Sequence, residues 1–142
     1  MADRRSLISV AAGALALLVA AVPAQADPAP MNGDYRVRVD GSDFGVWTFT
    51  PECTTAAGGC TATVEARAKG WSAVATLSEG RWTLTRTSET LFGCGDGSSS
   101  AGEMRAKWDA GTLTGSLLMV PDGKRCGGSS APLRGALELL KT

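Results

Sequence analysis

The chain has 142 residues, with 14 basic and 14 acidic side chains and no histidine. Without histidine, no Ser-His-Asp or Cys-His catalytic arrangement can form, and the commonest general base at neutral pH is missing. The balanced charge also argues against nucleic acid and anionic membranes as main partners, because both require clustered Lys and Arg. We therefore expect a protein that is not an enzyme and holds no cofactor.

The first 26 residues have the composition of a secretory signal peptide. Arg4 and Arg5 precede an uncharged run over 7–22, and the small-residue pattern Ala24-Gln25-Ala26 follows. The run is shorter than the ~20 residues of a membrane-spanning helix. We expect cleavage after Ala26 and a product without a stable membrane anchor, located outside the cell or in the cell envelope.

The remaining 116 residues are enough for a single domain. Removal of residues 1–26 takes away two basic and one acidic residue, which leaves a formal net charge of −1. We expect residues 27–33 to form a flexible N-terminus and residues 34–142 to form one β-domain.

Apolar and polar residues alternate with a period of two from Tyr35 onward, which predicts strands that bury one face. Turn signals rich in glycine separate these segments, and no amphipathic stretch of helical length lies between them. The expected strands are, in chain order, 35–39, 44–50, 61–66, 71–77, 82–87, 104–109, 112–120 and 133–140.

The last of these segments also fits a helical stripe, because Leu133, Leu137 and Leu140 share one side of a helix. We favour a strand, since Gly135 lies within the segment and a closing strand would cover an open sheet edge. Eight short strands joined mostly by tight turns predict an antiparallel up-and-down meander. The meander would close into a small barrel or a flattened sandwich, and periodicity does not choose between them.

Four cysteines behind an export signal indicate two disulfides. We favour Cys53 with Cys60, which bracket a short loop, and Cys94 with Cys126, which lie in two glycine-rich loops. A zinc site is the alternative, but the chain has no histidine and no C-x-x-C spacing. We therefore expect no metal.

The glycine- and serine-rich segments 92–102 and 127–130 predict two long surface loops that a disulfide would hold side by side. Such a patch suits a non-enzymatic binding module that recognises another extracellular or envelope protein. The candidate partner-binding residues are Asp96, Lys124 and Arg125.

The tryptophans suggest an alternative function. Trp71, Trp82 and Trp108 lie in phase with the apolar faces of separate expected strands, where aromatic residues usually fill a core. They could instead line an apolar ligand site in a barrel interior, which would make the protein a carrier of a small apolar ligand or lipid. A carboxylate-dependent hydrolase is the third alternative, although no spacing singles out an acidic pair.

Five short stretches carry a resemblance to a known group of proteins. They are Gly33-Asp34-Tyr35, residues 45–51, the segment from Cys53 to Cys60, residues 80–84, and Cys94-Gly95-Asp96-Gly97. With these stretches the chain resembles small secreted proteins of mycobacteria and related actinobacteria over most of residues 31–140. Members of that group are β-rich and disulfide-bonded and have no established function. The resemblance implies a compartment and an architecture, and it supplies no catalytic residues.

Overall fold

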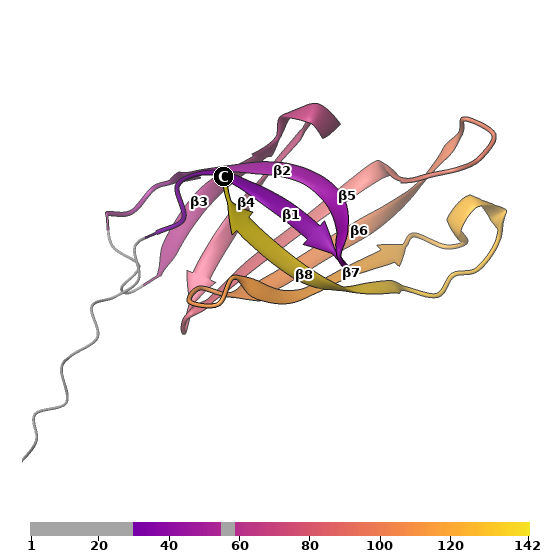
Figure 1. Cartoon of the computed structure of the whole chain (residues 1–142). Helices are drawn as coiled ribbons and strands as arrows, with labels where there is room; N and C mark the ends of the chain where they lie inside the picture. The colour runs from indigo at the N-terminus through magenta and orange to yellow at the C-terminus, as the bar shows by residue number, and fades with distance from the viewer. Residues whose placement is uncertain (1–29, 55–58) are drawn as a thin grey trace, which may run out of the picture.

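The computed structural model describes residues 30–54 and 59–142, which form a closed antiparallel β-barrel (Figure 1). Each strand pairs with the next along the chain, and the last strand pairs with the first, so every strand has two neighbours. The strands are β1 (Gly33–Val39), β2 (Ser42–Pro51), β3 (Cys60–Ala66), β4 (Trp71–Ser78), β5 (Arg81–Gly93), β6 (Ser99–Asp109), β7 (Thr114–Pro121) and β8 (Leu133–Lys141).

The predicted eight-stranded meander is confirmed, and the barrel forms rather than the flattened sandwich. The ambiguous last segment is a strand, β8, which closes the barrel against β1. The expected signal peptide, residues 1–26, lies outside the described residues, as do 27–29 and 55–58. Within the described part of the chain, no helix has the length and apolar character to cross a membrane.

An antiparallel meander places successive turns at alternate ends of the barrel. The loop end carries the turn at 40–41, the short 3₁₀ turn η1 (Arg67–Lys69), the tip of the β5–β6 hairpin and the β7–β8 connection with its own 3₁₀ turn, η2 (Arg125–Gly127). The terminal end carries residues 30–32, the disulfide between Cys53 and Cys60, the turns at 79–80 and 110–113, and the C-terminus.

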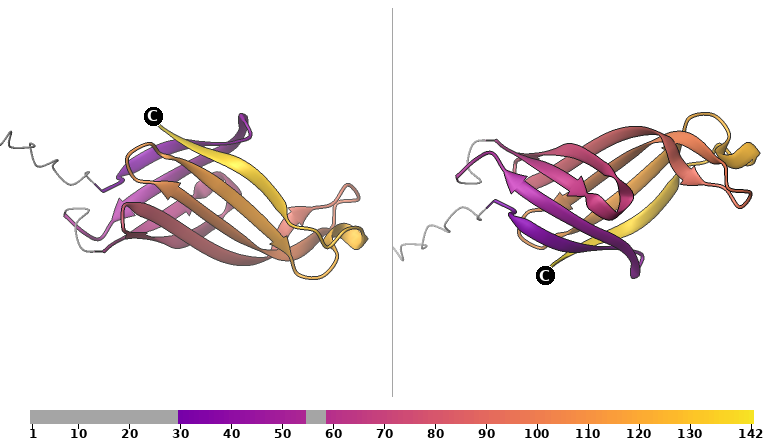
Figure 2. Two further views of the ribbon diagram at one scale, coloured as in Figure 1. Left: turned by 90° about the horizontal axis from the view of Figure 1, so that it is seen from below. Right: turned by 90° about the horizontal axis from the view of Figure 1, so that it is seen from above.

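At the loop end, β5 and β6 continue beyond the body of the barrel. They have 13 and 11 residues, against seven in β1. Figure 2 shows from two sides that the tip of their hairpin lies beside the β7–β8 connection, away from the other strands. We call the hairpin tip (92–100) and the connection (122–132) the lobe.

The expectation of a long loop over residues 92–102 is wrong. The pairing of β5 with β6 continues past an irregularity between Ser88 and Phe92, and only residues 94–98 form the turn. The reason is local packing, because Phe92 is buried against Gly102, where a side chain would collide with it. Glycine here marks a close approach of two strands rather than a loop.

Side chains fill the interior of the barrel. Trp82 and Trp108 lie opposite each other in the β5–β6 register and stack with ring centroids 6.3 Å apart. Both are only 1% exposed. The small residues Gly115 and Gly135 do not leave space, because a Cβ at Gly115 would overlap the carbonyl oxygen of Lys107 and one at Gly135 would overlap Val39. The largest fully buried side chains are Trp47, Trp82, Trp108, Phe49, Leu84, Met104, Leu137, Leu139, Val37 and Val64.

Met31 closes the terminal end. Its side chain is 3% exposed, and its sulfur accepts a hydrogen bond from Nε1 of Trp108 at 3.2 Å. Met31, which lies in the segment expected to be flexible, therefore packs as part of the domain, because its sulfur satisfies a buried indole donor. Sequence periodicity could not show this, since Met31 precedes the first alternating segment.

Candidate functional site

The barrel is open at the loop end, where a cleft of about 210 Å³ lies among β2, η1, β4, β5, β6 and β7. We call it the mouth cleft. Polar and apolar groups both form its wall, and four polar side chains border it: Lys69, Arg86, Ser88 and Thr90. The apolar lining residues are Phe44, Trp47, Trp71, Leu91, Met104 and Met119.

A second hollow of about 290 Å³ adjoins the mouth cleft. The two share Phe44 and Met119, so they lie on either side of these side chains. Asp40 and Leu133 line the second hollow, and the Asp40 carboxylate accepts a hydrogen bond from the backbone N–H of Ala136 at 2.7 Å. Phe44 therefore separates the mouth cleft, which Lys69 and Arg86 border, from a hollow lined by both the carboxylate of Asp40 and the guanidinium-bearing Arg134.

The mouth cleft forms where the filled part of the barrel ends. Inward positions along β5 are taken in turn by Trp82, Leu84, Arg86 and Ser88, so the apolar series stops at Arg86. Arg86 lies opposite Met104 of β6. Because alternate residues of a strand face the same side, Arg86 is directed to the interior face rather than to the outer surface.

The guanidinium of Arg86 lies over the ring of Trp71, with its central carbon 4.6 Å from the ring centroid. The side chain is half-buried, and burial lowers the pKa of Arg86 below its ordinary value. An arginine keeps its proton in proteins, so the charge persists. Among residues 30–54 and 59–142, no side chain or backbone oxygen accepts a hydrogen bond from this guanidinium, and no carboxylate pairs with it.

A bulge in β5 shapes the rim of the cleft. Ser88 pairs with Gly102, and Phe92 pairs with Ser100. Between these two pairs, β5 has three residues, 89–91, whereas β6 has only Ala101. Bulges of this kind bend a strand and redirect its side chains. Leu91 packs against the core and lines the cleft, and a Cβ at Gly102 would lie 2.9 Å from its Cδ2. The rim therefore depends on the absence of a side chain at Gly102.

The three tryptophans that the sequence proposed as ligand lining lie in different environments. Only Trp71 borders the mouth cleft, whereas Trp82 and Trp108 are within the packed core. Trp47, which the sequence analysis did not single out, connects them, because its ring centroid lies 5.5 Å from that of Trp71 and 6.2 Å from that of Trp108. The aromatic rings form a continuous series from the cleft to the core.

The disulfides join Cys53 to Cys60 and Cys94 to Cys126, the two pairs that the sequence favoured. The second pair connects the hairpin tip to η2 and so holds the two parts of the lobe together, with 5.7 Å between the Cα atoms. The backbone N–H of Cys126 also donates to the hydroxyl of Ser100 at 3.3 Å.

The proposed partner-binding residues all lie in the lobe. The carboxylate of Asp96 accepts hydrogen bonds from the side chain and the backbone N–H of Ser98, and these bonds lower the pKa of Asp96. The guanidinium of Arg125 lies 5.8 Å from the ring centroid of Phe92. Lys124 is exposed. Asp96 and Arg125 therefore also have structural roles, in the hairpin turn and in the packing of the lobe.

Arg86, Phe44, Met104 and Met119 also line the mouth cleft, and none of them was predicted as a site residue from the sequence. One signal was available for Arg86, because it continues the inward phase of Trp82 and Leu84 and is a charged residue where an apolar one is expected. Its role over Trp71 could not be inferred, since strand pairing and the position of the open end were not known.

Comparison of the chain with models of protein families, with curated proteins and with solved structures finds no match in any of the three.

Proposed function

We propose that this protein is a non-enzymatic binding module that takes a small ligand into the mouth cleft. The observation that supports this function is the partly exposed Trp71, placed with Phe44 and Met119 at the opening of a barrel that is otherwise filled. Concave apolar sites with a few polar groups are the usual form of small-molecule sites. The carrier hypothesis assigned the apolar ligand to the barrel interior. Because side chains fill the interior, we place this ligand at the mouth instead.

The size of the cleft limits the ligand. Its volume of about 210 Å³ is below the roughly 300 to 1,000 Å³ of pockets that bury a drug-sized molecule. A single ring or a short chain fits this size better than a complete lipid.

We further propose that the protein works outside the cell or in the cell envelope. The pattern of residues 1–26 supports export, and two disulfides suit an oxidising compartment.

An uncharged probe tests the binding function. Phenylacetamide, titrated while the indole N–H signals are followed by NMR, should shift the Trp71 signal and leave that of Trp82 unchanged. Phe44→Ala should weaken the response, because it removes one wall of the cleft. The control is Val74→Ala, which removes apolar atoms from an outer position of β4 that is 56% exposed. Equal responses in Phe44→Ala and Val74→Ala, or no response at Trp71, would reject the site.

Recognition of an extracellular or envelope protein by the lobe is a second candidate function. The observation that favours it is the disulfide between Cys94 and Cys126, which holds an extended hairpin and a separate loop together beyond the barrel. A fixed conformation reduces the entropy lost on binding. Lys124→Ala should then reduce capture of a partner from culture fluid, whereas Lys107→Ala, on the outer surface of β6, should not. Unchanged capture by Lys124→Ala would count against the lobe.

A further inference from the structure

Two cations in the described ranges continue the inward phase of their strands, one near each end of the barrel, and Lys141 is exposed whereas Arg86 is half-buried. Lys141 of β8 lies opposite Tyr35 at the terminal end, and Arg86 of β5 lies at the loop end. The ammonium of Lys141 lies 4.7 Å from the ring centroid of Tyr35 and donates to the backbone carbonyl of Asn32. Arg86 has the same kind of aromatic contact, with Trp71, but it has no acceptor within the described ranges.

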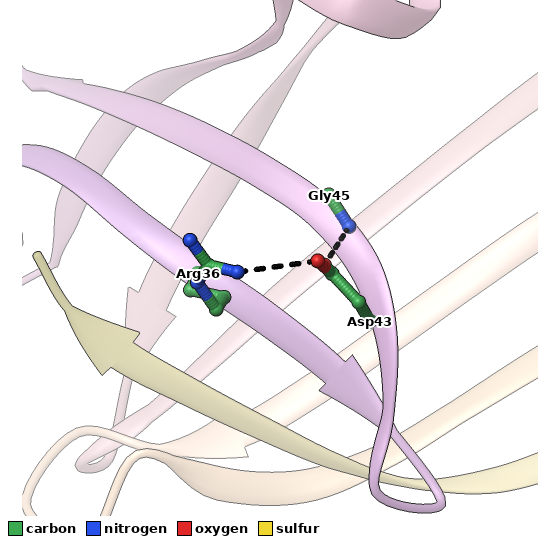
Figure 3. A network of polar contacts seen from close by, with 3 residues as sticks. All are labelled: Arg36, Asp43 and Gly45. Carbon is green, nitrogen blue, oxygen red and sulfur yellow. Dashed lines mark hydrogen bonds and ion pairs between the residues drawn. The ribbon is translucent and has the colours of Figure 1, made fainter.

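Several arginines on the outer surface do have carboxylate partners. Figure 3 shows Arg36, whose Nη1 lies 3.2 Å from Oδ2 of Asp43, while Asp43 also accepts the backbone N–H of Gly45 at 2.9 Å. Exposed pairs of this kind contribute little to stability. A carboxylate next to the more buried Arg86 would interact more strongly, because screening by water is weaker there. Arg86 has no carboxylate partner within the described residues, like most of their basic side chains, and what distinguishes it is its partial burial over Trp71 in the mouth cleft.

The contact with Trp71 leaves the hydrogen-bonding capacity of Arg86 intact. An indole ring attracts the cation but offers no oxygen acceptor, so the N–H donors of the guanidinium are free to bind an anion. A guanidinium matches the two oxygens of a carboxylate, and such pairs are the stronger class of hydrogen bond. Lys69 adds a second positive charge at the rim of the same cleft.

The groups beside Arg86 indicate what the rest of the ligand is. Trp71, Phe44 and Met119 present rings and a thioether to the cleft, and such surfaces pack well against a ring or a short alkyl group. No carboxylate of the described residues lines the mouth cleft, since Asp40 lies with Arg134 in the adjoining hollow, beyond Phe44. Positive charge and apolar side chains therefore lie together in the mouth cleft.

We propose that the mouth cleft binds small apolar carboxylates, with the carboxylate paired to Arg86 and the ring or short alkyl group against Trp71, Phe44 and Met119. This inference rests on the proposed binding function and specifies its ligand class. Arg86 makes the site prefer an acid over an uncharged analogue of the same shape. The apolar side chains contribute binding energy that is the same for the acid and for the analogue.

The test compares acids with their amides, which have nearly the same shape and no charge. Phenylacetate with phenylacetamide, and octanoate with octanamide, are titrated into the full domain by calorimetry and by the Trp71 indole signal. The wild-type protein should bind at least one acid about tenfold more tightly than its amide, the size expected for a charge-assisted hydrogen bond. Equal affinities for acid and amide in both pairs would overturn the inference and leave the binding function standing. If no compound shifts the Trp71 signal, both fail.

Variants locate the preference. Arg86→Met should bring the acid to the affinity of its amide, while the amide affinity changes little, because the methionine side chain keeps the apolar stem. Arg36→Met is the matched control, since it removes an arginine that already has a carboxylate partner on the outer surface, and it should keep the preference. A preference that survives in Arg86→Met would overturn the assignment. The wild-type comparison needs no variant and stands even if Arg86→Met fails to fold.

Discussion

The two ends of the barrel are built from similar parts and differ in how those parts are used. At the terminal end, Met31 covers Trp108, and the cation Lys141 donates to a backbone carbonyl. At the loop end, Trp71 is partly exposed and the cation Arg86 has no acceptor in the described chain. The cation at one end thus has a backbone acceptor, and the cation at the other has none. This difference is the basis of our proposal that a filled barrel binds a ligand where its last layer is incomplete.

The two disulfides follow the same division. Cys53 and Cys60, seven residues apart, close a short connection at the terminal end, whereas Cys94 and Cys126 are 32 residues apart and join two separate segments of the lobe. The chain-entropy model assigns roughly 2 to 3 kcal/mol to the first and about 4 kcal/mol to the second. The longer bridge therefore also fixes the position of the loops next to the mouth cleft.

The largest expected effect comes from removing a ring from the filled part of the barrel. Trp108→Ala should lower the free energy of unfolding by roughly 3 to 5 kcal/mol, because it leaves a cavity beside Trp82, Phe49 and Met31. Trp71→Ala should cost less, about 1 kcal/mol, because Trp71 is already partly exposed at the edge of the core. Urea unfolding of both variants gives the comparison. Equal losses would mean that the loop end is as tightly packed as the core.

The next largest loss of stability comes from removing a disulfide, and it differs between the two disulfides. The double variant Cys94→Ala with Cys126→Ala should lose about 4 kcal/mol, and the double variant Cys53→Ala with Cys60→Ala should lose less from loop closure, roughly 2 to 3 kcal/mol. Native-state hydrogen exchange of the first variant should rise most in β5 and β6 beyond Ser88, whereas core amides that exchange through global unfolding should speed up only by the loss of global stability. A rise in β5 and β6 beyond Ser88 no larger than that in the core strands would contradict the local role of this bridge.

A smaller effect concerns the rim of the mouth cleft. Gly102→Ala should lower stability by roughly 1 to 3 kcal/mol, since the new Cβ would lie 2.6 Å from the carbonyl oxygen of Val120 and 2.7 Å from Phe92. Leu91 should move with this change, so ligand affinity at the mouth should fall as well. Gly93→Ala is the control on the same hairpin, because no atom lies within 4 Å of its added Cβ. Equal losses of stability and ligand affinity in Gly102→Ala and Gly93→Ala would contradict close packing at Gly102 as the cause.

The smallest effect is a pH dependence shared by the two ends. Hydrogen bonds lower the pKa of Asp96 in the lobe and of Asp109 at the terminal end below the ordinary value of 3.8. A lowered pKa in the folded state means that each carboxylate favours folding above that value and loses its contribution as the pH falls through the folded pKa. Asp96→Asn and Asp109→Asn should each flatten the fall in the thermal midpoint below about pH 4 by a small and similar amount. A large change in either variant would show an interaction other than these turn hydrogen bonds.

Most of the fold was accessible from the sequence, and the part that was not has identifiable causes. Alternation in segments such as 61–66 and 71–77 predicts strands because one face is buried, and the short spacing of Cys53 and Cys60 favours their pairing. The bulge before Phe92 was missed because a glycine- and serine-rich segment normally indicates a loop. Met31 was missed because it has no periodic neighbours.

The site was less accessible than the fold. Trp71 was identified as a candidate, but Trp82 and Trp108 share its sequence signature and differ only in their distance from the open end of the barrel. Arg86 could be assigned to the inward phase from sequence, yet its surroundings in the described chain are side chains from β2, η1, β4, β6 and β7. Surroundings that five other elements contribute cannot be inferred from the periodicity of one strand.

The most direct test of a binding site confined to the loop end is ¹⁹F NMR of the protein labelled with 5-fluorotryptophan, titrated with phenylacetate. The four tryptophans sample the molecule from the mouth cleft to the core. Binding at the mouth should shift the Trp71 resonance most and the Trp47 resonance less, and should leave Trp82 unchanged. A shift at Trp82 equal to that at Trp71, or a response that does not saturate, would contradict a site at the mouth of a filled barrel.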